Sequence, residues 1–122
     1  MNLKDVFTEI ENYFSPRIIC EVNDHYIKVA KIKGQEIPWH NHENEDELFY
    51  IVEGELLLEI ENQPALLLKK DDLYIIKKRI NHKVSSTDEC LIMLIEPKST
   101  EHTGKINAAI IKSIEEQMYY DQ

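Results

Sequence analysis

Two histidines and a nearby glutamate, His40, His42 and Glu47, have types and a spacing that could bind a metal ion. In an extended segment, side chains alternate between two faces, so His40 and His42 would project to one side and Asn41 to the other. Glu47 begins the apolar run that follows. A carboxylate facing a β-barrel interior needs a strong partner, because burying an unpaired charge costs several kcal/mol. A divalent cation would be such a partner.

The alternative interpretation is a solvated acidic loop in which the histidines have no common role. Glu43, Glu45 and Asp46 fill the insert before the strand, and we expect all three to be exposed to solvent. His25 follows a turn signal and His102 lies in a polar segment, so we expect both to be exposed and unrelated to any site. The tryptophan directly before the first histidine of the pair, Trp39, should take the opposite face, where it would pack under the barrel or in a dimer interface.

The beginning of the chain predicts one amphipathic helix. Apolar residues recur at helical spacing from Leu3 to Phe14, Asn2 can cap the first turn, and Pro16 lies just past the end. We therefore expect a helical lead-in over about residues 2–15.

From residue 17 on, the chain predicts a series of short β-strands separated by turn-forming residues. The predicted strands are 17–22, 25–33, 48–52, 55–61, 65–69, 73–76, 82–86 and 90–95. Short strands with frequent turn signals favour an antiparallel barrel or sandwich over βαβ units. The length of 122 residues fits one domain, with the barrel over about 17–104 and a C-terminal segment, 105–122, that is ambiguous between helix and strand.

Composition excludes several classes of function. The formal net charge of −9 argues against nucleic acid as a partner, because nucleic-acid-binding proteins usually carry a basic excess. The sequence contains neither an apolar run long enough to span a bilayer nor a signal-peptide pattern at its start. Cys20 and Cys90 are far apart, each in an apolar run, which indicates reduced, buried thiols. We therefore expect a cytoplasmic protein without membrane association.

Two of the three glycines frame the histidine segment. Written out, it is Gly34-x5-His40-x-His42-x4-Glu47-x6-Gly54. This pattern resembles the first conserved motif of the cupin superfamily, with every fixed position filled.

A second cupin motif, Gly-x5-Pro-x-Gly-x2-His-x3-Asn, matches only in register. When its histidine is aligned on His82, the other fixed positions hold Asp71, Lys77, Arg79 and Ser86. Without glycine at position 79, a turn that needs a positive φ would have to be rebuilt in another conformation. The basic run 77–79 is then a solvated hairpin turn or, alternatively, an anion-binding hook at the mouth of the pocket.

The resemblance, which spans about residues 15–104, implies an all-β fold. This would be a double-stranded β-helix (jelly-roll) barrel with a short N-terminal helix, forming a homodimer as small cupins commonly do. The chain is similar to bacterial cupins described as phosphomannose-isomerase-like. Carried over position by position, the resemblance implies a metal-ligand set of His40, His42, Glu47 and His82.

Three imidazoles and one carboxylate suit a divalent transition metal such as Fe, Mn, Ni, Zn or Co. Side chains with the same alternation as the ligands should line the pocket, and these are Phe49, Ile51, Tyr74, Ile76 and Val84. In the resulting hypothesis, one ion binds a small polar metabolite at its open positions, for isomerase, dioxygenase or lyase chemistry. The alternatives are a non-enzymatic metal- or sugar-binding sensor and a metal-free barrel filled by histidines, and the fold does not choose among them.

Overall fold

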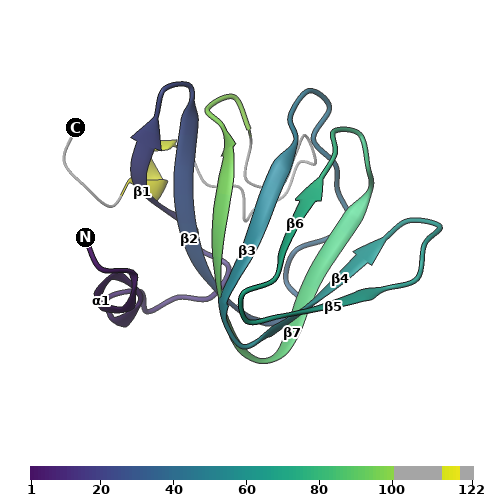
Figure 1. The fold of residues 1–122 in the computed structure, drawn as a ribbon, viewed down its shortest axis with the longest axis horizontal. Helices are drawn as coiled ribbons and strands as arrows, with labels where there is room; N and C mark the ends of the chain where they lie inside the picture. Colours follow the sequence, from purple (N-terminus) through teal and green to yellow (C-terminus); the bar gives the residue numbers. More distant parts are fainter. Residues whose placement is uncertain (101–113, 119–122) are drawn as a thin grey trace.

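The computed structural model describes residues 1–100 and 114–118, and its strands form two antiparallel sheets that make up a jelly-roll barrel (Figure 1). The larger sheet has the order β1-β2-β7-β3-β6, and in the other sheet β4 pairs with both β5 and β7. The strands are β1 (Arg17–Val22), β2 (His25–Gly34), β3 (Glu47–Glu53), β4 (Glu55–Ile60), β5 (Leu66–Lys69), β6 (Leu73–Ile76) and β7 (His82–Pro97). The all-β prediction and most of the predicted strands are confirmed.

One strand, β7, belongs to both sheets. Its first residues pair with β4, as in the pair Ile60–His82, and its second half pairs with β2 and β3. The predicted break at 87–89 is therefore wrong, because these residues continue the strand. Their polar character reflects exposure at the point where β7 passes from one sheet to the other.

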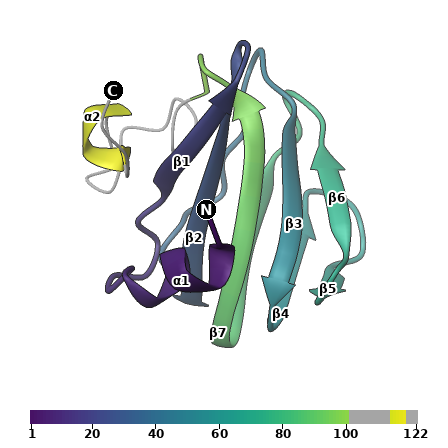
Figure 2. The ribbon, with the colours of Figure 1, turned by 60° about the vertical axis from the view of Figure 1, so that its left-hand side comes forward.

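The N-terminal helix, α1 (Leu3–Thr8), is shorter than predicted. Asn2 caps it as expected, with its Oδ1 accepting from the Asp5 backbone N–H at 3.3 Å. Figure 2 shows α1 lying against the outer side of the larger sheet, where its apolar residues pack with those of β1 and β2. The helical spacing of apolar residues continues to Phe14, but this residue has a φ of 54° and belongs to the barrel core instead. The helix therefore ends at Thr8, and the side chain of Phe14 packs inside the barrel.

The barrel core consists of aliphatic and aromatic side chains from both sheets. It includes Cys90, whose thiol is free and fully buried, and Cys20 is also free and half-buried. In the described residues no helix is both long enough and apolar enough to cross a membrane.

A short helix, α2 (Ile114–Gln117), resolves part of the C-terminal ambiguity in favour of helix. It lies beside β1, and Met118 forms an isolated bridge with Ile18. His102, the predicted end of the barrel at 104 and the rest of the C-terminal segment lie outside the described residues.

The turns of the second motif keep the backbone conformation for which glycine is usual. Gly34 and Gly54 have φ values of 89° and 85°, while Asp71 and Arg79, at the two glycine positions of the second motif, have φ values of 71° and 67°. The expectation that the turn at Arg79 is rebuilt in another conformation is therefore wrong. The Arg79 backbone N–H donates to the carbonyl oxygen of His42 at 2.7 Å, which helps to hold this conformation.

Candidate metal centre

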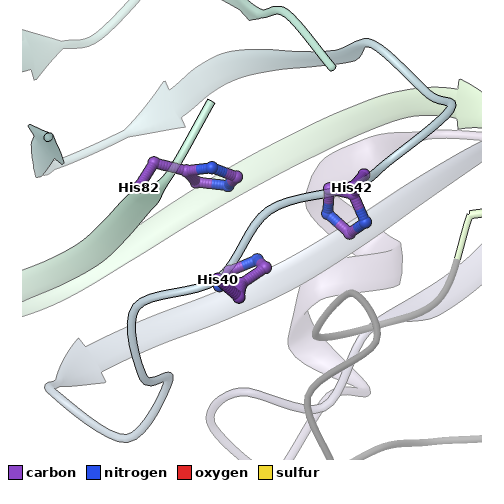
Figure 3. Close-up of side chains that lie close together, drawn as sticks. All are labelled: His40, His42 and His82. Carbon is purple, nitrogen blue, oxygen red and sulfur yellow. The ribbon is translucent and has the colours of Figure 1, made fainter. Parts of the chain in front are cut away.

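Two of the three clustered histidines are joined through their backbones. His40 lies in the connection between β2 and β3, and its N–H donates to the carbonyl oxygen of His82 at 3.0 Å while the His82 N–H donates back at 2.9 Å. His40 thus forms an isolated antiparallel bridge with His82, outside the named strands. His42 follows on the same connection, and the three rings converge (Figure 3).

The three histidines are buried and close enough to share one ion. His40, His42 and His82 are 4%, 3% and 0% exposed, and one nitrogen of each lies within 4.8 Å of the others. The Nδ1 atoms of His40 and His82 each lie 2.9 Å from a backbone carbonyl oxygen, that of Pro38 and that of Ile80. If Nδ1 carries the proton and donates it there, Nε2 presents its lone pair to the cluster, which is the usual arrangement for a metal-binding imidazole.

Several ring nitrogens in this cluster have no hydrogen bond. Among the described residues, none is a hydrogen-bond partner for either ring nitrogen of His42 or for Nε2 of His82. Burying a polar atom without a partner costs about 1–3 kcal/mol, so such atoms require an explanation. A divalent ion bound between the three rings would satisfy His82 Nε2 and one of the two nitrogens of His42.

Glu47 faces the same point from the first position of β3. Its side chain is buried, and Oε1 lies 3.6 Å from His42 Nε2 and 3.8 Å from His82 Nε2. Of the other nearby acids, Glu43 and Asp46 are exposed as expected, whereas Glu45 is half-buried. The Ser99 hydroxyl donates to Glu45 Oε2 at 2.9 Å.

Burial keeps two of the imidazoles in the neutral form that binds metals. Burial, with the nearby His82, lowers the pKa of His40 from an ordinary 6.5 to about 4. The pKa of His82 is also lowered, again mainly by burial. Both imidazoles are therefore uncharged near neutral pH, and one ring nitrogen of each can bind an ion without first losing a proton.

Behind Glu47 lie two ionisable residues that we did not predict as part of the site, Glu96 and Lys28. Burial and the neighbouring Glu47 raise the pKa of Glu96 well above its usual range. Burial alone would also raise the pKa of Glu47, but the His42 imidazole and a hydrogen bond from Glu96 hold it below its usual range. Glu96 thus holds the proton that the two carboxyl groups share, and Glu47 faces the histidines as a carboxylate.

A small cavity of about 50 Å³ adjoins the cluster and is bordered by His40 and Glu47. Of the predicted pocket residues, Phe49 and Val84 line it, while Ile51 and Ile76 are buried in the surrounding core and Tyr74 packs partly buried against that core. The remaining lining residues are apolar, and we did not predict them: Phe14, Pro16, Ala30, Ile32, Ile37, Ile92 and Leu94. Several of them alternate along β2 and β7 with the same parity, which is the signal that could have identified them.

The other residues discussed above lie away from the cluster. His25 is exposed, as expected, and Trp39 is 40% exposed, so it does not pack under the barrel. The basic run 77–79 is exposed, and Lys77 Nζ lies 3.4 Å from Asp46 Oδ2. This pairing favours the solvated turn over the anion-binding hook.

Comparisons with known proteins agree with this fold. A family model described as "Cupin domain" matches residues 29–96. The chain is 34% identical over 100 residues to the uncharacterized protein YdbB of Bacillus subtilis. The aligned region covers 82% of this chain and 88% of YdbB.

Two solved structures are also similar. A cupin-2 domain containing protein from Shewanella frigidimarina superposes with a TM-score of 0.76 at 37% identity, covering 80% of this chain and 93% of that one. Protein NMB1881 from Neisseria meningitidis superposes with a TM-score of 0.72 at 25% identity, covering 80% and 97%.

Proposed function

The chain belongs to the cupin family, and from that premise we propose that His40, His42, Glu47 and His82 bind one divalent transition metal ion. The observation that carries this proposal is the set of buried ring nitrogens on His42 and His82 that have no hydrogen-bond partner in the described part of the chain. Imidazole and carboxylate ligands suit Fe, Mn, Ni, Zn or Co, and metal availability decides among ions that the same ligands accept.

A four-ligand set leaves room for a second molecule at an octahedral ion. When bound, the ion would act as a Lewis acid toward a ligand oxygen, as metal centres with open positions do. The chain itself supplies an apolar wall and a cavity of about 50 Å³. Because this volume is well below the roughly 300–1,000 Å³ of most ligand pockets, we propose a small polar ligand with few heavy atoms rather than a sugar phosphate.

Metal analysis of the purified protein tests the site. We expect close to one equivalent of divalent metal per chain, and its loss in the His40→Ala/His82→Ala double variant. His25→Ala is the matched control, because His25 is exposed and should leave the metal content unchanged. Absence of metal from every preparation, or its retention in the double variant, would contradict the assignment.

A metal-binding sensor without catalysis is the second candidate, and the small size of the cavity favours it. To separate the two, the metal-loaded protein can be offered small oxygen-containing metabolites, diketones and sugar phosphates, with product formation and oxygen consumption measured together. Turnover that disappears in the double variant supports an enzyme. A ligand that binds without turnover supports the sensor.

We also propose that the protein is a homodimer that pairs through the outer face of its larger sheet. Leu73 and Ile75 on β6 are 59% and 45% exposed, and they adjoin Tyr50 and Leu48 of β3. Exposed apolar patches of this kind are common at interfaces. Light scattering should give twice the chain mass for the wild type and for Leu67→Asp, an exposed control on β5, but a monomer for Ile75→Asp. A monomeric wild type would refute the dimer.

A further inference from the structure

A lysine and a glutamate are buried side by side next to the histidine cluster. Lys28 on β2 and Glu96 on β7 are 1% and 2% exposed, and Lys28 Nζ lies 2.6 Å from Glu96 Oε1. Burying a lysine ammonium beside a carboxyl group costs several kcal/mol, and replacing such a buried pair with apolar residues is often neutral or stabilising. Stability alone therefore does not explain this pair.

The pair continues the barrel interior directly behind the cavity. Lys28 lies two positions before Ala30 and opposite Leu94, and both of these residues line the cavity. Glu96 lies two positions after Leu94 on the same face of β7. The pair is therefore next to Glu47, which lines the same cavity from β3.

A continuous series of contacts links the pair to the histidines. Glu47 and Glu96 lie one position beyond the Leu48–Ile95 pair of the adjacent strands β3 and β7, so the Glu96 carboxyl group is placed to donate to the Glu47 carboxylate. Glu47 Oε1 in turn lies within 3.8 Å of His42 Nε2 and His82 Nε2. On the other side, Lys28 Nζ donates to Gln117 Oε1 at 2.6 Å, so that α2, 89 residues along the chain, anchors the lysine. Two of the three donors of the ammonium group thereby have fixed acceptors.

We propose that Glu96 and Lys28 are positioning residues that hold the Glu47 carboxylate toward the three histidines, and that Gln117 fixes the position of Lys28. The inference rests on the metal site proposed above. A glutamate side chain has several rotatable bonds, so an oxygen that points at the ion must be held there by hydrogen bonds from its neighbours. Loss of such supporting residues typically weakens metal binding by about 10–100-fold.

Two single substitutions at position 96 separate side-chain reach from the ability to ionise. Glu96→Gln cannot ionise but keeps an oxygen for Lys28 and an N–H donor for Glu47, so its affinity for Co²⁺ should stay within about threefold of wild type. Glu96→Asp keeps a carboxyl group but is one methylene too short to reach both partners, so its affinity should fall about 10-fold or more. The reverse order, with Asp tolerated and Gln impaired, would overturn the proposal.

A double variant removes the pair as a unit. Lys28→Met/Glu96→Leu replaces it with apolar residues of similar volume, which should preserve the thermal melting temperature within a few degrees. Its Co²⁺ affinity should fall about 10–100-fold, and its visible Co²⁺ spectrum should match that of Glu47→Gln, because both variants lose an ordered carboxylate ligand. A wild-type affinity and spectrum in the folded double variant would refute the proposal. If this variant does not fold, the two substitutions at position 96 decide.

The two proposals fail in different ways. If the wild type does not bind Co²⁺, the metal site is wrong and the positioning role is wrong with it. If Co²⁺ binding depends on His40 and His82 but is the same in every variant of Lys28 and Glu96, only the positioning role is refuted.

Discussion

The two motif regions both contribute to one histidine cluster, but they form their left-handed turns from different residues. The first, residues 34–54, has glycine at both of its left-handed turns, and the second, residues 71–86, has Asp71 and Arg79 at the corresponding positions with nearly the same φ. Both regions nevertheless contribute buried histidines to the cluster, His40 and His42 from the first and His82 from the second. The positive φ of these turns is therefore compatible with residues other than glycine, at the cost of some backbone strain, where a Cβ has space.

The space available for a Cβ differs sharply between Gly34 and Gly54, the two glycines of the first region. A Cβ on Gly54 would lie 2.6 Å from the Glu89 carbonyl oxygen and 3.0 Å from Cys90 Cα, whereas a Cβ on Gly34 would meet nothing within 4 Å. Gly54 is thus required by packing against β7, and Gly34 only by its conformation.

The largest expected effect compares one ligand from each region. His42→Ala and His82→Ala should each weaken metal binding by more than the roughly 10–100-fold expected for loss of a supporting residue, and by similar factors. Competition with a chelator of known affinity measures both. If one variant binds the ion as the wild type does, then the ligand set draws on only one region.

The next effect compares the glycines. Gly54→Ala combines backbone strain with a clash against backbone atoms and should lower the free energy of unfolding by about 3 kcal/mol or more, whereas Gly34→Ala should lower it by about 1 kcal/mol. Urea unfolding of the two variants side by side provides the measurement. Equal losses would show that packing at β7 is not what requires Gly54.

Acid should lower the stability of the metal-free protein, because each motif region buries a histidine whose pKa is lowered, His40 in the first and His82 in the second. Because the pKa of His40 is about 4 in the fold against an ordinary 6.5, protons bind the unfolded chain more tightly. The stability contributed by the neutral imidazole is complete above about pH 6.5 and is lost as the pH falls toward 4, on the order of 3 kcal/mol for His40. Urea midpoints between pH 7 and 4 should fall more steeply for the wild type than for His40→Ala/His82→Ala. Parallel curves would argue against buried neutral histidines.

The smallest effect concerns the second region. At a residue with positive φ, glycine is preferred over alanine by about 1 kcal/mol, so Arg79→Gly should be more stable than Arg79→Ala by that amount. Differential scanning calorimetry can resolve it. Lys78→Gly and Lys78→Ala are the neighbouring control pair, because Lys78 is exposed but is not among the residues with positive φ. Equal stability of the two Arg79 variants would indicate that its turn relaxes on substitution.

Local patterns predicted the strands and the His40–His42 pair well because both depend on nearby residues, whereas His82 was assigned only through the resemblance to the cupin motifs. Alternation along the strands placed Phe49 and Val84 at the cavity, and the spacing of the first motif placed His40 and His42 side by side. The polar residues at 87–89 suggested a turn, since a bend that keeps β-pairing cannot be distinguished from a turn by composition.

The Lys28–Glu96 pair could not be predicted in this way. A lysine between Ile27 and Val29 suggests a solvent-facing position on a strand, and only the pairing of β2 with β7 brings its partner alongside. Gln117 lies in a segment whose pattern did not distinguish helix from strand. Contacts between residues far apart in sequence decide these positions, and one sequence gives no direct signal for them.

Because β7 belongs to both sheets, it determines how the barrel can unfold. His82 and Glu96 lie near opposite ends of this strand, which is paired with β4 through one half and with β2 and β3 through the other. Neither sheet can separate from the barrel while β7 stays in place, so its amide protons should exchange with solvent only when the whole domain unfolds. If an ion bound by His82 is released through unfolding, its release can then be no faster than global unfolding of the domain.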